Sequence, residues 1–235
     1  MKISACIFAR GGSKGLQSKN ILEFGGRPLI AWAIEQGLAL KNVDQVFVST
    51  DSIEIADIAR QHGAVVPFIR PASLATDDSP EWLAWRHMLA FQENESGCLP
   101  DVLLSIPTTA PLRLTSDIQQ CLDVYELGDV DAVVTVTDAR RSPFFNMLKI
   151  NNQGYANLVI TNDSVIARRQ DSPIVYDMTT VAYVLDTRFV LERNGIFEGR
   201  VKAVHVPPER AIDIDNILDY EIAKFLLLQK MNCSE

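Results

Sequence analysis

The apolar run Ile3-Ser-Ala-Cys-Ile-Phe8 leads directly into Ala9-Arg-Gly-Gly-Ser-Lys-Gly-Leu-Gln-Ser-Lys-Asn20. The second stretch combines three glycines with cations at Arg10, Lys14 and Lys19. Glycine lets a backbone turn tightly and approach a ligand closely, and successive N–H groups in such a turn bind anions. Arg and Lys side chains add full charges that hold phosphate. The sequence therefore predicts a strand over residues 3–8 and, directly after it, a loop that binds a nucleoside triphosphate.

Two common phosphate-binding patterns do not describe this loop. A P-loop needs Gly, four residues and then Gly-Lys-Ser/Thr, which is absent, so a P-loop NTPase is disfavoured. The dinucleotide pattern Gly-x-Gly-x-x-Gly also fails, because Gly11 and Gly12 are adjacent. The composition of the loop leaves a flexible basic turn at the surface as the alternative.

Short apolar runs and amphipathic segments alternate along the first 136 residues. We predict further strands over 46–48, 64–69, 102–106 and 132–136, and helices over 28–40, 80–95 and 115–127 together with one that Gly63 ends. This order is typical of an α/β fold with a mostly parallel, Rossmann-like sheet and helices on both faces. Ligands bind outside the carboxyl ends of such strands. We therefore expect loops 9–20, 70–79 and 107–115 to converge there.

The alternation changes after residue 139. Apolar runs at 147–150 and 155–160 flank Asn151-Asn-Gln-Gly154, which predicts a β-hairpin. The earlier pattern then resumes, with strands predicted over 181–185 and 201–206 and a final helix over 217–230. We therefore predict a nucleotide-binding domain formed by residues 1–138 and 176–235, with an inserted arm over 139–175.

A pair of acidic residues, Asp213 and Asp215, precedes the last predicted helix in Ile212-Asp-Ile-Asp215. Alternate residues of an extended segment point to the same side, so both carboxylates would share one face. Hard oxygen ligands of this kind suit Mg²⁺, which also keeps waters and substrate phosphates. Two alternatives remain open: solvated acids at a strand edge, or Asp215 as the N-cap of the helix.

The first loop, with Ser18-Lys19-Asn20 at its end, resembles the signature loop of the CMP-sialic acid synthetases (acylneuraminate cytidylyltransferases). Further segments stand in the order found in that family, namely Val48-Ser-Thr-Asp51, Arg70-Pro71 with Leu74-Ala75 and Asp77, Pro111-Leu-Arg113 and the Asp-x-Asp pair. The resemblance implies a nucleotidyltransferase sheet, a β-hairpin dimerisation arm and a homodimer. It also implies that CMP passes from CTP to the anomeric hydroxyl of a 2-keto sugar acid, with release of pyrophosphate and with Mg²⁺ as cofactor.

The same resemblance implies roles for individual residues. Nucleotide contacts would come from Arg10, Gly11, Gly12, Ser13, Lys14, Lys19, Asn20 and Arg70. Catalysis would rest on Lys19, Arg10 and Asp213, with Asp213 and Asp215 as metal ligands. The sugar acid would meet Arg169, Tyr176, Thr179 and Tyr183. Read from the residues alone, Arg169 could equally be a solvated cation, and either tyrosine a core aromatic.

Two departures from the family pattern concern the acceptor and the base. Pro107 and Ala110 stand where the family usually has Gln and Ser, and Thr179-Thr180 replace an Asn-Gly of the sialic acid enzymes. These departures indicate an acceptor other than N-acetylneuraminate, such as legionaminate, pseudaminate or another 2-keto sugar acid. A Kdo-type or other sugar nucleotidyltransferase and a non-catalytic nucleotide-binding module remain as alternatives.

The overall composition argues against some partners. The chain of 235 residues has a formal net charge of −8 at pH 7, which disfavours general affinity for nucleic acid or an anionic membrane. No secretory signal or apolar stretch of membrane-spanning length stands out, and the four cysteines lack metal-ligand spacing. We therefore predict a cytoplasmic protein with no nucleic-acid or membrane partner.

Overall fold

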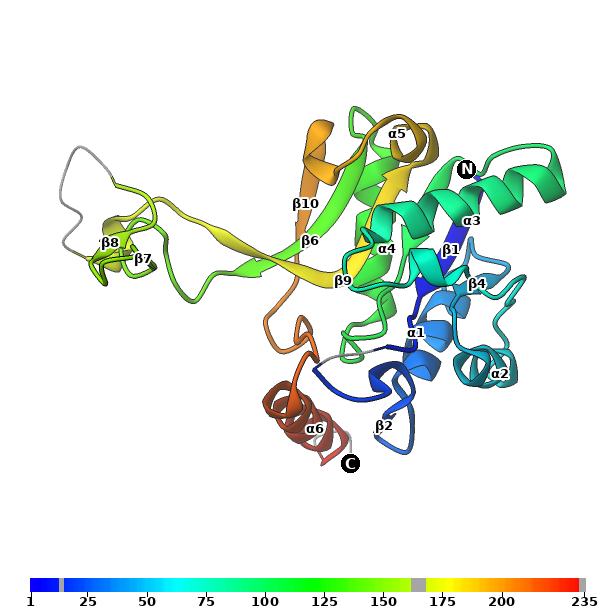
Figure 1. Cartoon of the computed structure of the whole chain (residues 1–235), viewed down its shortest axis with the longest axis horizontal. Coiled ribbons are helices and arrows are strands. Elements are labelled where there is room, and N and C mark those ends of the chain that lie inside the picture. The colour runs from blue at the N-terminus through cyan, green and yellow to red at the C-terminus, as the bar shows by residue number, and fades with distance from the viewer. Residues whose placement is uncertain (13–14, 162–167, 233–235) are drawn as a thin grey trace.

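A computed structural model describes residues 1–12, 15–161 and 168–232 of the chain. Within these residues, six strands form the central sheet in the order β10-β6-β9-β5-β1-β4 (Figure 1). Their bounds are β1 Ile3–Phe8, β4 Val46–Ser49, β5 Val102–Ser105, β6 Ala132–Asp138, β9 Tyr176–Asp186 and β10 Val201–His205.

Most neighbouring strands of this sheet are parallel. β1 pairs in parallel with β4 and β5, and β10 pairs in parallel with β6, whereas β9 runs antiparallel between β5 and β6. All four residues of β5 are buried, as expected for a strand covered on both faces. The prediction of a mostly parallel α/β sheet is confirmed.

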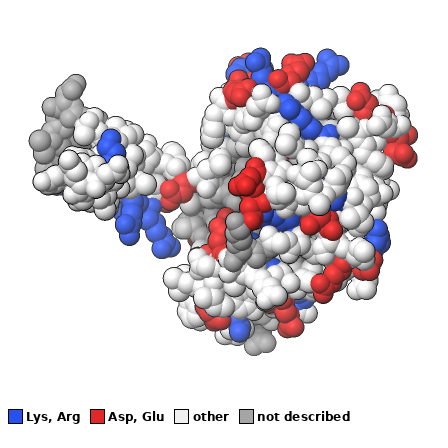
Figure 2. Space-filling view, in the orientation of Figure 1, with Lys and Arg blue, Asp and Glu red and all other residues white. Residues whose placement is uncertain are grey.

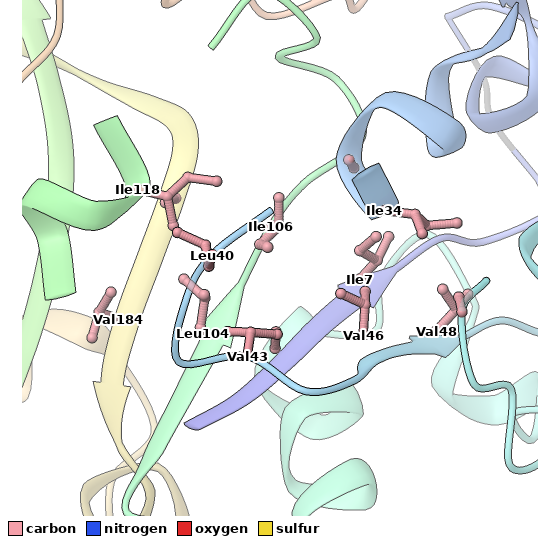
Figure 3. Packing of buried hydrophobic residues seen from close by; sticks show 14 of the residues in the cluster. Ile7, Ile34, Leu40, Val43, Val46, Val48, Leu104, Ile106, Ile118 and Val184 are labelled. Carbon is pink, nitrogen blue, oxygen red and sulfur yellow. The ribbon is translucent and has the colours of Figure 1, made fainter. Parts of the chain in front are cut away.

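Helices cover both faces of the sheet. Their bounds are α1 Leu29–Leu38, α2 Ile53–Gln61, α3 Glu81–Ser96, α4 Thr115–Glu126 and α5 Thr187–Glu192. Along β1, Ala5 and Ile7 join the core cluster that contains residues of α1, α2 and α4, whereas Cys6 joins the cluster built with α3 and α5. Figure 3 shows Ile7 and Val46 of the sheet packed beside Ile34 of α1. The period of two in the strand therefore divides its side chains between two helical layers.

The prediction of a strand over residues 64–69 was wrong. This segment forms only two isolated bridges, Phe47 with Val65 and Thr50 with Ile69. Pro67 lies between them and has no N–H to donate, so a continuous ladder cannot form. The segment still follows β4, because Arg70 N donates to Thr50 O at 2.7 Å. The next loop therefore begins at the carboxyl end of the sheet, where the prediction put it.

The inserted arm leaves the sheet after β6 and returns at the start of β9 (Figure 1). Its hairpin consists of β7 (Leu148–Ile150) and β8 (Ala156–Leu158), which pair antiparallel around the predicted turn. At the root of the arm, Asp138 pairs with Tyr176. The expected boundaries of the insertion, residues 139 and 175, coincide with these strand ends.

A β-bulge interrupts the pairing of β6 with β9. Val134 pairs with Tyr183, but the next residue, Thr135, pairs with Thr179. Residues 180–182 are thus the extra residues of β9 at this point. Bulges re-aim side chains and are common beside active sites, and this one lies at the edge of the cleft described below.

The C-terminal helix α6 (Ile217–Asn232) packs on a small two-stranded sheet, β2 (Glu23–Phe24) with β3 (Arg27–Pro28). Gly25 joins these two strands with φ +59°, and a Cβ there would lie 2.5 Å from Leu227. Short 3-10 helices complete the fold at Lys19–Ile21, Ala72–Leu74, Arg169–Asp171 and Ile196–Glu198. Among the described residues, no helix has both the length and the apolar character needed to cross a bilayer.

Candidate active site

A cleft of about 400 Å³ lies beyond the carboxyl ends of β1 and β5. The loops after these strands both line it, as do the loop before α3 and the segment before α6. The polar and charged lining residues include Arg10, Lys19, Asn20, Arg70, Asp77, Ser79, Glu81, Thr108, Thr109, Thr180, Asp213 and Asp215. The predicted convergence of the loops is therefore observed. Figure 2 shows side chains of both signs on the face of the molecule that it presents.

Two cations of the first loop lie against carboxylates of other loops. Lys19 Nζ donates to Asp215 Oδ1 at 2.8 Å, and Arg10 Nη1 donates to Asp77 Oδ1 at 2.6 Å. Asp215 is largely exposed, with 67% of its side chain accessible, whereas that of Lys19 is only 16% accessible. A phosphate group could therefore displace the exposed carboxylate from the ammonium group without opening the core.

Asn20 fixes the end of the first loop. Its buried side chain donates from Nδ2 to Arg10 O at 2.8 Å and accepts at Oδ1 from Thr108 Oγ1 at 2.5 Å. The loops after β1 and β5 are thus tied together by a single amide. Because both its donor and its acceptor are used inside the protein, the amide orients the backbone of Arg10 toward the cleft.

The first loop also touches the acidic segment before α6. A Cβ at Gly15 would lie 2.2 Å from Asp215 O, so this approach requires glycine. On the other side of the acidic segment, Ile214 N donates to Thr109 O at 2.8 Å. The Asp-x-Asp segment is therefore held between the loops that follow β1 and β5.

Asp213 is the more enclosed of the two acidic residues. Burial raises the pKa of its carboxyl, as does the charge of Asp215, while hydrogen bonds from Thr109 and Thr180 and the charge of Lys19 act in the opposite direction. Its Oδ1 is buried and has no hydrogen-bond partner among the described residues. A buried oxygen of this kind is costly unless a ligand satisfies it.

These two carboxylates fit a divalent cation that is completed by substrate. The Oδ1 atom of Asp213, which has no hydrogen-bond partner among the described residues, is a hard oxygen ligand, and Asp215 adds a second carboxylate two residues on. No group of three or more His, Cys, Asp or Glu side chains in the described part of the chain could hold a metal ion by itself. The site therefore matches Mg²⁺, which usually takes one or two carboxylates and fills its other positions with water and phosphate oxygens.

Arg70 and Ser79, which also line the cleft, each present a buried polar atom. Arg70 Nε and Ser79 Oγ have no hydrogen-bond partner among the residues described. Burial lowers the pKa of Arg70, while Asp51 and Glu81 favour its charged form. Phe8 and Tyr183 line the same cleft. Apolar rings beside a few unsatisfied polar atoms are typical of a binding site for a planar polar group.

Arg113 braces the loop that follows β5. Its fully buried guanidinium donates to Pro107 O and to Val181 O. Burial lowers its pKa to about 9, against the charges of Asp213 and Asp117, so the group stays charged at neutral pH. Val181 lies in the bulge of β9, and Arg113 thereby connects the bulge with the loop carrying Thr108 and Thr109.

Several predicted site residues lie in this cleft and several do not. It is lined by Arg10, Lys19, Asn20, Arg70, Tyr183, Asp213 and Asp215. Ser13 and Lys14 lie outside the described residues. The N–H of Gly11 donates to Asp51 Oδ1 at 2.9 Å, and Gly12 is exposed beside it.

The predicted sugar residues other than Tyr183 are placed elsewhere. Thr179 is buried and donates to Thr135 Oγ1 at 2.7 Å, so its hydroxyl is committed inside the sheet. Tyr176 is exposed at the root of the arm, with its ring 6.1 Å from that of His205. Arg169 lies on the arm and donates to Ala139 O at 2.6 Å. Within a single protomer, these three side chains do not line the cleft.

Sequence reasoning missed other lining residues. Thr108, Thr109, Ser79 and Glu81 face the cleft, and Thr180 does so in place of its neighbour Thr179. The hydroxyls after β5 were visible in Pro107-Thr-Thr-Ala110, and their position after a strand was the available signal. Glu81 carried no comparable signal, because an acidic residue at the start of a helix is ordinary.

The chain is similar in sequence and fold to proteins of known activity. Residues 5–227 match a family model described as cytidylyltransferase. A CMP-N,N'-diacetyllegionaminic acid synthase of Campylobacter jejuni is 33% identical over 229 residues, covering 97% of this chain and 96% of that protein. A post-translational flagellin modification protein B of Campylobacter coli is 32% identical with the same coverage. A solved structure of CMP:2-keto-3-deoxy-manno-octonic acid synthetase complexed with CTP covers 98% of this chain with a TM-score of 0.72 at 14% identity, a likeness of fold.

Proposed function

The chain belongs to the cytidylyltransferase family, as a CTP-dependent enzyme that transfers CMP to a sugar acid, and we propose that its acceptor is a nine-carbon 2-keto sugar acid of the legionaminate type. The observation that carries this proposal is the meeting of Lys19 with the carboxylates of Asp213 and Asp215 in the cleft that also contains Arg10 and Arg70. Cations and a pair of hard oxygen donors at the ends of parallel strands suit a nucleoside triphosphate.

In the proposed reaction the anomeric hydroxyl of the sugar acid attacks the α-phosphorus of CTP. A bond forms between the anomeric oxygen and phosphorus, the bond from phosphorus to the bridging oxygen breaks, and pyrophosphate leaves with the electron pair. The hydroxyl proton is released. Catalysis in such transfers is mostly positioning and electrostatic stabilisation. Lys19, released from Asp215, would neutralise charge at the α-phosphate, and Arg10 would orient the phosphate chain.

We propose Mg²⁺ as the cofactor, held by Asp213 and Asp215. When bound, it would withdraw charge from the departing pyrophosphate. The chain prepares this site through Thr109 and Thr180, whose hydrogen bonds favour the charged form of Asp213. Ile214, between the two aspartates, is fully buried and fixes the direction of the segment.

A homodimer formed through the arm is part of the proposal. Two-stranded hairpins are marginal by themselves, yet the arm carries large apolar side chains in solvent: Ile150 and Tyr155 at the hairpin are 71% and 68% exposed, and Ile174, where the arm returns to the sheet, is 81% exposed. Figure 2 shows much of the visible arm surface without charge. A second copy would cover this surface and would bring Arg169 of one protomer to the cleft of the other, where its guanidinium could bind the sugar carboxylate.

Pyrophosphate release tests the proposal directly. The purified protein is incubated with Mg²⁺ and CTP against a panel of legionaminate, pseudaminate, N-acetylneuraminate and Kdo. Preferred release with legionaminate supports the proposed acceptor, whereas a preference for pseudaminate, N-acetylneuraminate or the eight-carbon acid Kdo would replace it. If the protein binds CTP but releases no pyrophosphate with any of the sugar acids, the proposed reaction would be contradicted and a nucleotide-binding module favoured.

A further inference from the structure

We propose that Glu81 is the residue through which this protein selects cytosine over uracil, by accepting a hydrogen bond from the exocyclic amino group of the base. The inference rests on the proposed nucleotide site and adds a residue that determines its base specificity. It concerns the part of the cleft lined by Arg70, Ser79 and Glu81.

Glu81 is placed there by the start of α3. It is the first residue of that helix, after Pro80, and its side chain lines the cleft together with Phe8, Ala84 and Tyr183. Trp85, one turn further along, donates from Nε1 to Glu81 Oε1 at 3.1 Å. Glu81 is an exposed residue, and the described part of the chain shows no hydrogen bond to its Oε2. One carboxylate oxygen is therefore held in place while the other remains available to a ligand.

The neighbours of Glu81 complete a set of donors and acceptors. Arg70 interacts with the Glu81 carboxylate through its charge, and Arg70 Nε is buried without a partner among the described residues. Ser79 Oγ, two residues before Glu81, is likewise buried and unsatisfied within that part of the chain. Since buried polar groups are nearly always hydrogen-bonded, these atoms point to a ligand with a polar edge.

That set matches the edge of cytosine. Cytosine donates from its amino group at C4 and accepts at N3 and O2, whereas uracil accepts at O4 and donates from N3. An ionised carboxylate only accepts and a guanidinium only donates, so Glu81 suits the amino group and Arg70 suits N3 or O2. Uracil in the same position would place its O4 against a carboxylate oxygen. Phe8 and Tyr183 would contact the faces of the ring.

The charge on Glu81 has opposing influences. The pKa of its carboxyl is raised above the ordinary value, chiefly by desolvation, while the Trp85 hydrogen bond and the charge of Arg70 act in the opposite direction. Asp77, Asp213 and Asp215 lie in the same cleft, but they accompany the cations of the first loop. The alternative role for Glu81 is structural, because a carboxylate in the first turn of a helix interacts favourably with the helix dipole and stabilises the helix.

Replacing Glu81 by Gln separates the two roles. A glutamine amide keeps the length of the side chain, and it can accept from the amino group of cytosine or donate to O4 of uracil. We measure kcat/KM for CTP and UTP with the best acceptor acid in the wild type, Glu81→Gln and Glu81→Asp. The ratio of the CTP value to the UTP value is expected to fall about 10- to 100-fold in Glu81→Gln. It should fall less in Glu81→Asp, which retains an acceptor carboxylate.

Glu93→Gln is the matched control. Glu93 is an exposed residue of the same helix, and its substitution by Gln removes the same charge as Glu81→Gln. The inference would be overturned if folded Glu81→Gln kept the wild-type ratio of kcat/KM for CTP to kcat/KM for UTP, whether both values stay the same or both fall by the same factor. If Glu81→Gln does not fold, the ratio in Glu81→Ala, which has no acceptor, decides, and a ratio equal to that of the wild type overturns the inference. Absence of turnover in the wild type would refute the proposed function instead, and calorimetric titration with CTP and UTP would then measure the same ratio as affinities.

Discussion

Lys19 Nζ lies 2.8 Å from Asp215 Oδ1, although the two residues are 196 positions apart in the chain. The contact joins the first loop, after β1, to the segment that precedes the last helix. Gly15 supports it, because any larger residue would collide with the backbone of Asp215. The cation and the proposed metal ligand are therefore neighbours before substrate arrives, so a triphosphate that binds between them exchanges one ion pair for others.

Removing the cation should abolish most of the activity. For Lys19→Ala we expect kcat/KM for CTP to fall by about 10²- to 10³-fold, the range seen when a preorganised electrostatic contact is lost. Stability should change little, because Asp215 is largely exposed and can be hydrated. Pyrophosphate release and thermal unfolding measure the two quantities. Lys41→Ala, at an exposed position, controls for loss of charge, and wild-type turnover in Lys19→Ala would remove this residue from the mechanism.

Removing the more enclosed carboxylate, that of Asp213, should abolish the Mg²⁺-dependent activity. In Asp213→Asn the neutral amide would bind the cation poorly, so activity should be lost at all Mg²⁺ concentrations. Asp215→Asn retains the buried ligand and should instead shift the Mg²⁺ requirement to higher concentration. A titration of initial rate against Mg²⁺ distinguishes the two, with Asp44→Asn as the exposed control. Full activity of the double variant would exclude these residues as the metal site.

The parts of the site that sequence reasoning placed correctly are those fixed by strand ends. Arg10 and Asn20 follow β1, Arg70 follows the bridge of Ile69 with Thr50 beyond β4, and the parallel sheet brings those ends together whatever the details of the loops. The failure at residues 64–69 has a local cause, since Pro67 removes one ladder hydrogen bond from an otherwise strand-like run.

Side-chain direction was harder to predict than position. The bulge of β9 turns Thr179 toward Thr135 and leaves Thr180 at the cleft, and nothing in Met178-Thr-Thr-Val181 indicates where strand pairing shifts. Glu81 was missed for a related reason. Its function depends on an orphaned Arg70 Nε and on Trp85, contacts that exist only after α3 packs on the sheet.

Arg169 provides a test of the proposed dimer. It lies on the arm, away from the cleft of its own protomer, so in the dimer it would serve the site of its partner. Arg169→Ala should raise the KM for the sugar acid about 10-fold or more and leave the KM for CTP nearly unchanged. A change in the KM for CTP alone would contradict this placement.

Mixing two defective variants, assayed at a sugar-acid concentration well below the KM of the wild type, tests the arrangement across subunits. In a heterodimer of Arg169→Ala with Lys19→Ala, one cleft has both defects and the other has neither, so refolding the two proteins together should restore part of the activity. Ile150→Glu, which puts a charge on the exposed face of the arm, should give monomers by sedimentation. No recovery on mixing verified heterodimers would show that each protomer uses its own Arg169.

Arg113 should matter for stability before it matters for chemistry. Arg113→Met leaves Pro107 O and Val181 O without the donor that satisfies them, and it removes a buried charge near Asp117. We expect the free energy of unfolding to fall by about 2–4 kcal/mol. Urea denaturation measures the loss, with Arg60→Met, a half-exposed arginine on α2, as control. A loss equal to that of the control would show that water replaces the guanidinium.

Asp131 should make part of the stability depend on pH. Hydrogen bonds from the Arg200 side chain and backbone lower the pKa of this carboxyl below its ordinary value of 3.8. A carboxyl whose pKa is lower in the folded state contributes its full stabilisation above the unfolded-state pKa and loses it as the pH falls through the folded-state pKa. We therefore expect Asp131→Asn to lower the Tm by about 2 °C at pH 7 and to converge with the wild type below pH 3.8. The thermal unfolding of both proteins, followed between pH 7 and the lowest pH at which the wild type folds, measures this difference. Asp44→Asn should show no such convergence, and a difference between Asp131→Asn and wild type that grows toward acid pH would reverse the sign assigned to this ion pair.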